Sequence, residues 1–175
     1  THIHVGVPRQ DWAMPLVGAM ARLYPLVLAA SASSPFFEGE DTGFASQRTM
    51  LFQQLATNGL PWDLGTWAEF EAYADELVEV GMITVPTEIR WDIRPAPKFG
   101  TVENRVPDAS PTLGELGCVA AWTQCIAEYT FRELDAGRHV APLPQWLLRE
   151  NKFRTARYGL DATVITPEPG RRQQP

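Results

Sequence analysis

The first residues of the chain alternate between polar and apolar side chains with a period of two. Ile3, Val5 and Val7 are β-branched and alternate with His2, His4 and a glycine. This pattern predicts a β-strand that the following proline ends. Because successive side chains of a strand point to opposite faces, we expect His2 and His4 on the same face.

The next segment has the composition of a buried helix. Apolar residues are so frequent between Asp11 and Ala32 that we expect burial on almost every side. Asp11 is a suitable N-cap, and Pro15 is tolerated in a first helical turn. Pro25 predicts a kink, or a break into two shorter helices.

A polar segment from Ser33 to Ser46 follows and is rich in Ser, Gly, Pro and acidic residues. It predicts an ordered loop, which we expect Phe36, Phe37 and Phe44 to anchor against the core. Loops of this composition often carry binding residues. A short helix is expected after it, over residues 47–56.

Two capping boxes mark the starts of later helices. Thr66 with Glu69, and Thr112 with Glu115, each place a hydroxyl residue three positions before a glutamate and ahead of apolar residues at helical spacing. A last amphipathic helix is predicted over about 144–158.

Between these helices, the segment 90–106 predicts two strands joined by a turn that contains Pro and Gly. Charged residues alternate with apolar ones in both strands. Asp92 and Arg94 are therefore expected to share one face, and Glu103 and Arg105 to share a face of the other strand.

Strands and helices occur in mixed order, without a regular alternation of strand and crossover helix, which favours the α+β class. We expect one domain over residues 1–162 and a disordered tail over 163–175, where Pro, Gly, Arg and Gln dominate the last ten positions. No phosphate-binding glycine loop of the usual types is present. Any nucleotide must be held in another way.

Composition narrows the classes of partner. The net charge of −6 and pI near 5.1 argue against a nucleic-acid partner, and small molecules or proteins fit better. The apolar stretch Leu23–Ala32 is too short to span a bilayer, so no membrane association is expected. Cys118 and Cys125 lie two helical turns apart, about 10 Å, which is too far for a disulfide. We predict buried free thiols in a cytoplasmic protein.

Two pairs of residues have the chemistry of a phosphate or metal site. His2 and His4 can direct ring nitrogens into one cleft, although hydrogen-bonded strand histidines explain the pattern equally well. Glu103 offers a carboxylate for a hard cation, and Arg105 a guanidinium for phosphate charge. An exposed ion pair of little energetic value is the structural alternative for this second pair.

Four basic residues in the last predicted helix are further candidates for contacts with phosphate. Its members are Arg149, Lys152, Arg154 and Arg157. A solvated helix face explains such a run as well as phosphate contacts do.

Five blocks of sequence, in this order, resemble the bacterial carboxylate-amine ligases grouped with glutamate-cysteine ligase type 2. They are His-Ile-His-Val-Gly, Ser-Ala-Ser-Ser-Pro-Phe-Phe-Glu-Gly-Glu-Asp-Thr-Gly-Phe-Ala-Ser-Gln-Arg, Trp-Asp-Ile-Arg-Pro, Gly-Thr-Val-Glu-Asn-Arg and Glu-Asn-Lys-Phe-Arg-Thr-Ala-Arg-Tyr-Gly-Leu-Asp-Ala. Together they cover residues 2–162.

The resemblance implies a glutamine-synthetase-like fold, whose active site lies on a curved antiparallel sheet backed by helices. It also implies that ATP activates a carboxylate to an acyl phosphate, which an amine then attacks. Glutamate and cysteine are the nominal substrates, magnesium bridges the phosphates, and a homo-oligomer is possible.

The same resemblance assigns roles to individual residues. The implied metal ligands are His2 and Glu103. The implied catalytic arginines, near the transferred phosphate and the acidic substrate, are Arg48, Arg94 and Arg105. The residues implied to face the nucleotide are His4, Asn151, Arg154 and Arg157. The residues implied to contact substrate are Ser46, Arg48 and Asp92.

Members of this family are longer, and an upstream Glu-Glu-Glu strand supplies several of their metal carboxylates. We therefore expect this chain to be an incomplete central part of the catalytic domain, whose activity alone is an open question. The alternative is a noncatalytic binding or oligomerisation module that retains the fold. A metallohydrolase that uses His2, His4 and Asp92 is disfavoured, because no metal motif such as His-Glu-x-x-His is present.

Overall fold

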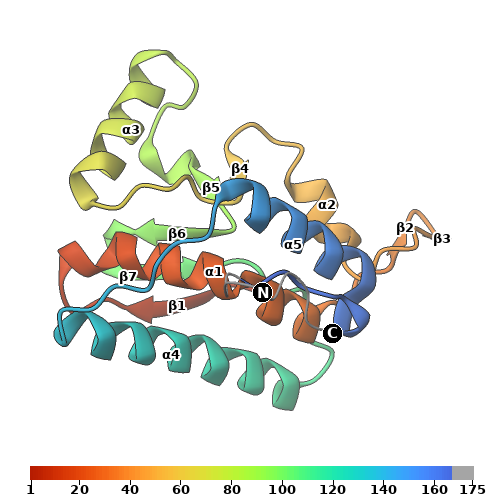
Figure 1. Ribbon diagram of the computed structural model, residues 1–175. Helices are drawn as coiled ribbons and strands as arrows, with labels where there is room; N and C mark the ends of the chain where they lie inside the picture. Colours follow the sequence, from red (N-terminus) through yellow and green to blue (C-terminus); the bar gives the residue numbers. More distant parts are fainter. Residues whose placement is uncertain (167–175) are drawn as a thin grey trace.

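A computed structural model describes residues 1–166, in which helices pack on one face of a three-stranded antiparallel sheet (Figure 1). The α+β class is confirmed. The strands are β1 (Ile3–Gly6), β2 (Phe36–Phe37), β3 (Glu40–Asp41), β4 (Asn58–Gly59), β5 (Arg90–Trp91), β6 (Ile93–Ala96) and β7 (Thr101–Asn104). The helices are α1 (Ala13–Ser31), α2 (Gln47–Phe52), α3 (Trp67–Glu79), α4 (Leu113–Asp135) and α5 (Gln145–Tyr158). Short 3-10 turns cover Gln10–Trp12, Pro86–Glu88, Pro97–Phe99 and Gly159–Asp161.

The main sheet has the order β1-β7-β6, with β7 antiparallel to both neighbours. The predicted hairpin between residues 90 and 106 is confirmed as β6 and β7, joined by the turn that contains Gly100 (φ 61°). On one face, Ile93 and Val102 are buried and Val5 packs against the core. The sheet therefore buries one side and leaves the other for polar side chains.

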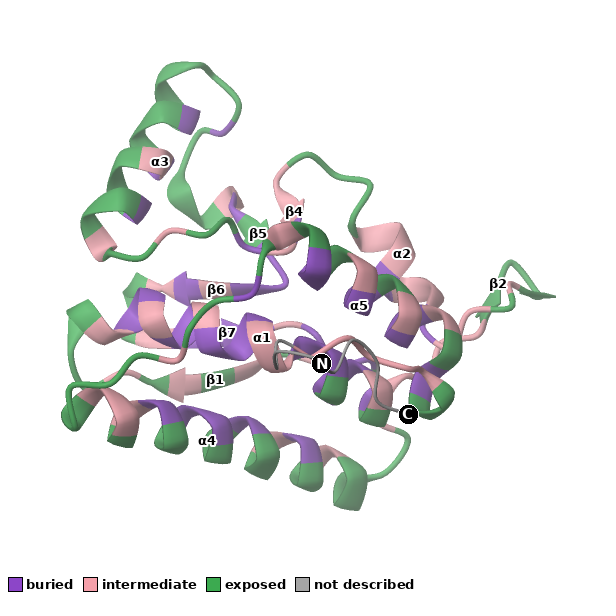
Figure 2. Ribbon diagram, viewed as in Figure 1, coloured by how far each residue is buried: buried purple, intermediate pink, exposed green. Residues whose placement is uncertain are grey.

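α1 is the central helix of the core. It contacts α4, α5 and strands β6 and β7, and most of its side chains are buried (Figure 2). Of the two alternatives expected at Pro25, a kink or a break, the break is wrong, because the helix runs through this residue. Contacts on both halves of the helix offset the one backbone hydrogen bond that proline removes. Asp11 is also not the N-cap: its carboxylate pairs with Arg9, and the helix begins without a side-chain cap.

The helical segment Gln10–Ser31 is long and apolar enough to cross a membrane by length and composition alone. However, 61% of its apolar window is buried inside the domain. Packing in the core is thus a sufficient reason for its apolar composition.

Both predicted capping boxes are confirmed, at Thr66 with Glu69 for α3 and at Thr112 with Glu115 for α4. The prediction of buried thiols is wrong, because both cysteines, on α4, are exposed and free. α4 lies at the edge of the molecule in Figure 1 and buries only the stripe that faces the sheet and α1. Cys118 and Cys125 lie outside that stripe.

The segment 33–46 contains the small β2-β3 hairpin. Phe44 packs against the core as predicted, whereas Phe36 and Phe37 are exposed. At the other end of the chain, Asn151 forms reciprocal hydrogen bonds with the backbone of Ile165, so the ordered part extends past residue 162. The rest of the predicted tail, 167–175, lies outside the described residues.

Candidate functional site

The polar face of the sheet carries one cross-strand row of functional side chains. The register places His4 of β1 opposite Glu103 of β7, and Glu103 opposite Arg94 of β6. Because the pleat repeats every two residues, His2 and Arg105 project on the same side. The antiparallel pairing of β1 and β7 thus brings together residues that are about 100 positions apart in the chain.

Glu103 is the centre of this polar cluster. Its side chain is only 3% exposed, and Oε2 accepts a hydrogen bond from Arg94 Nε at 2.6 Å. Oε1 accepts from Arg105 Nη1 at 3.0 Å and lies 2.9 Å from His2 Nδ1. His4 Nε2 is 3.8 Å from the same oxygen. Since the two histidines are 45% and 37% exposed, the cluster is open to solvent on the outer side.

These contacts change the ionisation of the cluster. Burial opposes ionisation of Glu103, but the hydrogen bond and charge of Arg94, together with the charge of Arg105, hold the pKa of this carboxyl below its usual value. Burial, followed by the positive charge of Arg105, lowers the pKa of His2. His2 is therefore neutral at pH 7. With two guanidiniums against one carboxylate, the cluster carries a net positive charge.

The protonation of His2 follows from its contact. A neutral ring that lies 2.9 Å from a carboxylate donates from Nδ1, which leaves Nε2 with a lone pair. His4 Nδ1 meets the hydroxyl of Thr101 at 2.8 Å. Both rings are thus oriented by neighbouring side chains while they remain partly exposed.

Arg48 reaches the end of the cluster from α2. Its Nη2 and Nη1 donate to the backbone carbonyls of Arg105 and Val106 at 2.8 and 3.2 Å. Its charge also lowers the pKa of His2, although by less than burial and Arg105 do. The buried carboxylate of Asp108 lies 3.6 Å from Arg48 and holds it in place.

Ser46 is not at the cluster surface. Its side chain is buried, caps α2 at Thr49 and donates to Asp108 Oδ1 at 3.0 Å. Asp108 also accepts from the backbone of Ser33 and the hydroxyl of Ser34. Sequence reasoning missed Asp108, which organises the ends of the 33–46 loop beneath Arg48.

Asp92 does not join Arg94 in the cluster, because the chain bends between β5 and β6. Its carboxylate forms a buried ion pair with Lys152 Nζ at 2.6 Å and lies beside the buried hydroxyl of Tyr24. Burial, and then the charge of Asp92, raise the pKa of Tyr24 well above its usual value. Lys152 is thus a core residue of α5, and for this member of the basic run a solvated face is wrong.

The remaining residues implied to face the nucleotide hold loops in place. The side chain of Asn151 forms hydrogen bonds with the backbone of Ile165. Arg154 pairs with Glu150 and donates to the carbonyl of Thr163. Arg157 donates to a backbone carbonyl in the 33–46 loop. In the described part of the chain, none of these contacts reaches Glu103.

The sequence matches the profile of glutamate-cysteine ligase family 2 over residues 1–174. The chain belongs to this family. The polar cluster is built from three of the blocks on which the resemblance rested.

Named relatives agree with the family assignment. The chain is 49% identical over 169 residues to "Putative glutamate--cysteine ligase 2" of Leifsonia xyli subsp. xyli, covering 97% of this chain and 45% of that protein. It is 46% identical over 172 residues to "Putative glutamate--cysteine ligase 2-1" of Arthrobacter sp., covering 98% and 45%. It is 49% identical over 164 residues to a protein of the same name from Mycolicibacterium smegmatis, covering 94% and 44%. The chain therefore spans less than half the length of these relatives.

Residues 1–166 alone do not present a complete set of magnesium ligands. Among residues 1–166, no group of three or more His, Cys, Asp or Glu side chains is arranged to bind a metal ion. His2 and Glu103, the implied ligands, instead contact each other, and both oxygens of Glu103 are engaged by guanidiniums. Magnesium demands a near-octahedral set of oxygens, which one engaged carboxylate does not supply.

Proposed function

We propose that this chain forms part of the catalytic surface of an ATP-dependent ligase that joins the carboxylate of glutamate to the amine of cysteine. Membership of glutamate-cysteine ligase family 2 supports this proposal. The observation that carries it is the convergence of His2, Arg94 and Arg105 on the single buried carboxylate of Glu103.

The proposed reaction has two steps. A glutamate carboxylate oxygen attacks the γ-phosphorus of ATP, the bond to the β-phosphate oxygen breaks, and ADP leaves. The cysteine nitrogen then attacks the acyl carbon, inorganic phosphate leaves with the electron pair of the C–O bond, and a base takes the nitrogen proton. The first step concentrates negative charge on phosphate oxygens, which positioned guanidiniums stabilise.

Arg94 and Arg105 are suited to that task. Each donates to Glu103 and is thereby fixed in direction, and Arg94 Nη1 also donates to the carbonyls of Thr87 and Ile89. Among the described residues, Nη2 of Arg94 and of Arg105 has no hydrogen-bond partner. These two groups are available to donate to phosphate or carboxylate oxygens of substrates.

His2 is suited to accept a proton. Its lowered pKa keeps the ring neutral, and the contact of Nδ1 with Glu103 leaves the Nε2 lone pair for an incoming amine. No protein nucleophile enters the proposed chemistry. The two exposed cysteines on α4 thus have no part in it.

Calorimetric titration of ATP into the purified chain tests the phosphate-binding role of the cluster. We expect Arg105→Gln to weaken ATP binding at least tenfold, because this guanidinium is fixed by Glu103 and is still 11% exposed. Arg138→Gln, which removes an exposed guanidinium paired with Glu133, is the matched control and should bind like the wild type. Equal affinities for the two variants would refute the role of the cluster.

Catalysis is then measured as glutamate-dependent ADP formation by the protein encoded by the complete reading frame that contains this sequence. We expect ADP formation that Arg105→Gln reduces at least a hundredfold. ATP binding without any glutamate-dependent ADP formation would overturn the ligase and support the noncatalytic binding module.

A further inference from the structure

A cavity lies between helices α2 and α5 and strand β4, and the chemistry proposed above does not use it (Figure 1). Its volume of about 580 Å³ is within the range of about 300–1,000 Å³ that is usual for small-molecule sites. Helix α5 supplies one wall, with Gln145, Arg149, Lys152 and Phe153. These positions are i, i+4, i+7 and i+8, so the four side chains share one face of the helix.

Aromatic side chains give the cavity an apolar surface that water still reaches. Trp62, which follows β4, is 57% exposed, and Phe153 of α5 is 44% exposed. A planar ring that packs against them removes apolar surface from water, which favours binding. The two side chains therefore provide a surface for an aromatic ring.

Arg149 supplies a free positive charge in the same lining. Lys152 is buried, and its ammonium group pairs with Asp92 at 2.6 Å, so its charge is already neutralised. Arg149 is exposed, and its guanidinium has no hydrogen bond or ion pair with any residue of the range 1–166. No acidic side chain lines the cavity, although the chain as a whole has a net charge of −6. The cavity thus favours an anion.

Amide side chains complete the polar part of the lining. Gln53 and Gln54 follow α2, and Gln145 Nε2 donates to the carbonyl of Pro61 at 2.7 Å, which fixes the direction of that amide. Amides can donate to a carboxylate without adding charge. A triphosphate fits poorly, because it would bring several negative charges to a single free guanidinium.

We propose that this cavity binds a small monocarboxylate that carries an aromatic ring, at a site separate from the polar cluster. The carboxylate pairs with Arg149, and the ring packs against Trp62 and Phe153. None of the side chains that converge on Glu103 lines the cavity. The inference does not depend on the proposed ligase activity.

Calorimetric titration of 2-naphthoate into the purified chain tests this site. The comparison probe is 2-naphthamide, which has the same ring system and no charge. We expect naphthoate to bind at least tenfold more tightly than naphthamide. Arg149→Gln should weaken naphthoate binding at least tenfold and leave naphthamide binding unchanged. Trp62→Leu should weaken the binding of both probes at least threefold, because it removes the ring contact and keeps the charge.

Two matched variants control for nonspecific effects. Arg132→Gln removes an exposed guanidinium of α4, and Trp146→Leu removes an exposed indole of α5 that does not line the cavity. Both variants should bind both probes like the wild type. Because Arg149 and Trp62 are exposed, we expect their variants to fold, which circular dichroism verifies. Wild-type naphthoate affinity in Arg149→Gln, or no naphthoate binding by the wild type, would overturn the proposal.

Competition with ATP tests whether the site is separate from the polar cluster. We expect saturating ATP, and separately Arg105→Gln, to change the affinity for naphthoate less than threefold. Displacement of naphthoate by ATP would show that the cavity belongs to a nucleotide site and would overturn the inference.

The protein encoded by the complete reading frame is titrated in the same way. It should show the same preference for naphthoate over naphthamide. Loss of naphthoate binding there would show that another segment of the protein fills the cavity, which would also refute a small-molecule site.

Discussion

Replacement of Glu103 by glutamine tests the energetic role of the polar cluster. The substitution keeps the size of the side chain and removes its negative charge. In the wild type this carboxylate is 3% exposed and accepts from Arg94, Arg105 and His2. A carboxamide has one acceptor oxygen, and its NH₂ group would face one of the guanidiniums donor to donor.

The expected loss of stability follows from the two guanidiniums that remain after the substitution. Arg94 and Arg105, which are 19% and 11% exposed, would keep their charges without a neutralising partner. Removal of one partner from a buried ion pair costs about 3–5 kcal/mol. Because the outer side of the cluster is solvated, we expect a smaller loss of about 2–4 kcal/mol in the free energy of unfolding, or roughly 5–15 °C in Tm for a chain of 175 residues.

Urea unfolding at pH 7.5, followed by tryptophan fluorescence, measures this loss. Glu128→Gln is the matched control, because Glu128 pairs with Arg132 on the surface of α4 and is 56% exposed. We expect that control to change the stability by less than about 0.5 kcal/mol. If Glu103→Gln destabilises the protein no more than Glu128→Gln does, the cluster contributes nothing to stability and our reasoning is wrong.

Other predictions concern burial and ionisation. Lys152→Met should lower the free energy of unfolding by about 3 kcal/mol, because it leaves the buried carboxylate of Asp92 unpaired. In urea unfolding, the double variant Lys152→Met with Asp92→Asn should recover much of this loss. Equal losses in the single and the double variant would show that the two residues are not coupled. Both thiols, of Cys118 and Cys125, should react with Ellman's reagent in the folded protein, and protection until denaturant is added would contradict their exposure. Lowered pKa values in the folded state mean that the cluster stabilises the protein fully only above the usual pKa of each group. Stability should therefore fall as the pH drops below 6.5, where His2 takes up a proton in the unfolded chain. It should fall again below pH 4.5, where Glu103 takes up a proton in the unfolded chain. A urea midpoint that stays constant from pH 7 to 4 would refute this.

Some interpretations failed for an identifiable reason. The i, i+2 spacing of Asp92 and Arg94 predicted a shared face, but spacing determines the face only within an unbroken strand. A bend at Asp92 sends its side chain to Lys152, which lies 60 residues later in the chain. The two cysteines were misplaced because helical periodicity identifies a common face but not whether another element covers it.

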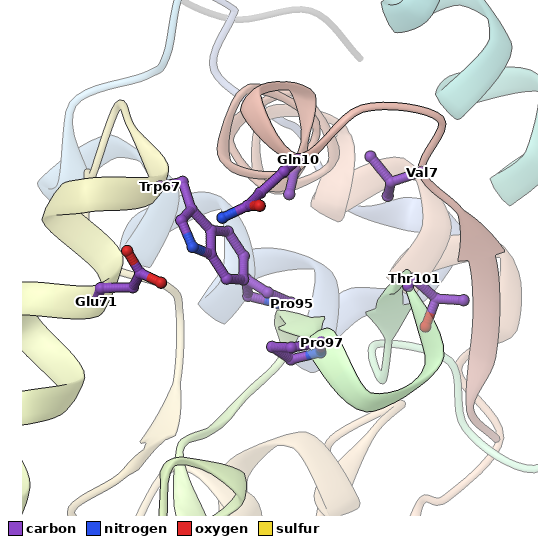
Figure 3. Close-up of a pocket in the computed structure, with 9 residues that line it drawn as sticks. Val7, Gln10, Trp67, Glu71, Pro95, Pro97 and Thr101 are labelled. Carbon is purple, nitrogen blue, oxygen red and sulfur yellow. The ribbon is translucent and has the colours of Figure 1, made fainter.

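The cavity lined by Trp67, Glu71, Pro95 and Pro97 could also not be predicted from the sequence (Figure 3). Trp67 and Glu71 belong to a helix whose capping box was evident, yet the apolar walls come from Pro95 and Pro97, in a different element. Nothing in a linear pattern reports that two such segments leave a space between them.

The amino-acid sequence alone determined the local elements and the composition of the polar cluster. Period-two alternation and a short hairpin turn fix which side chains of a strand share a face, so His2 and His4, and separately Glu103 and Arg105, could be paired before any coordinates. Only the tertiary structure decided that β1 adds to β7 and brings both pairs together, and that Asn151, Arg154 and Arg157 hold loops. The physical reason is that backbone geometry determines only which residues a few positions apart are neighbours. Contacts between segments distant in the sequence depend on how the whole core packs.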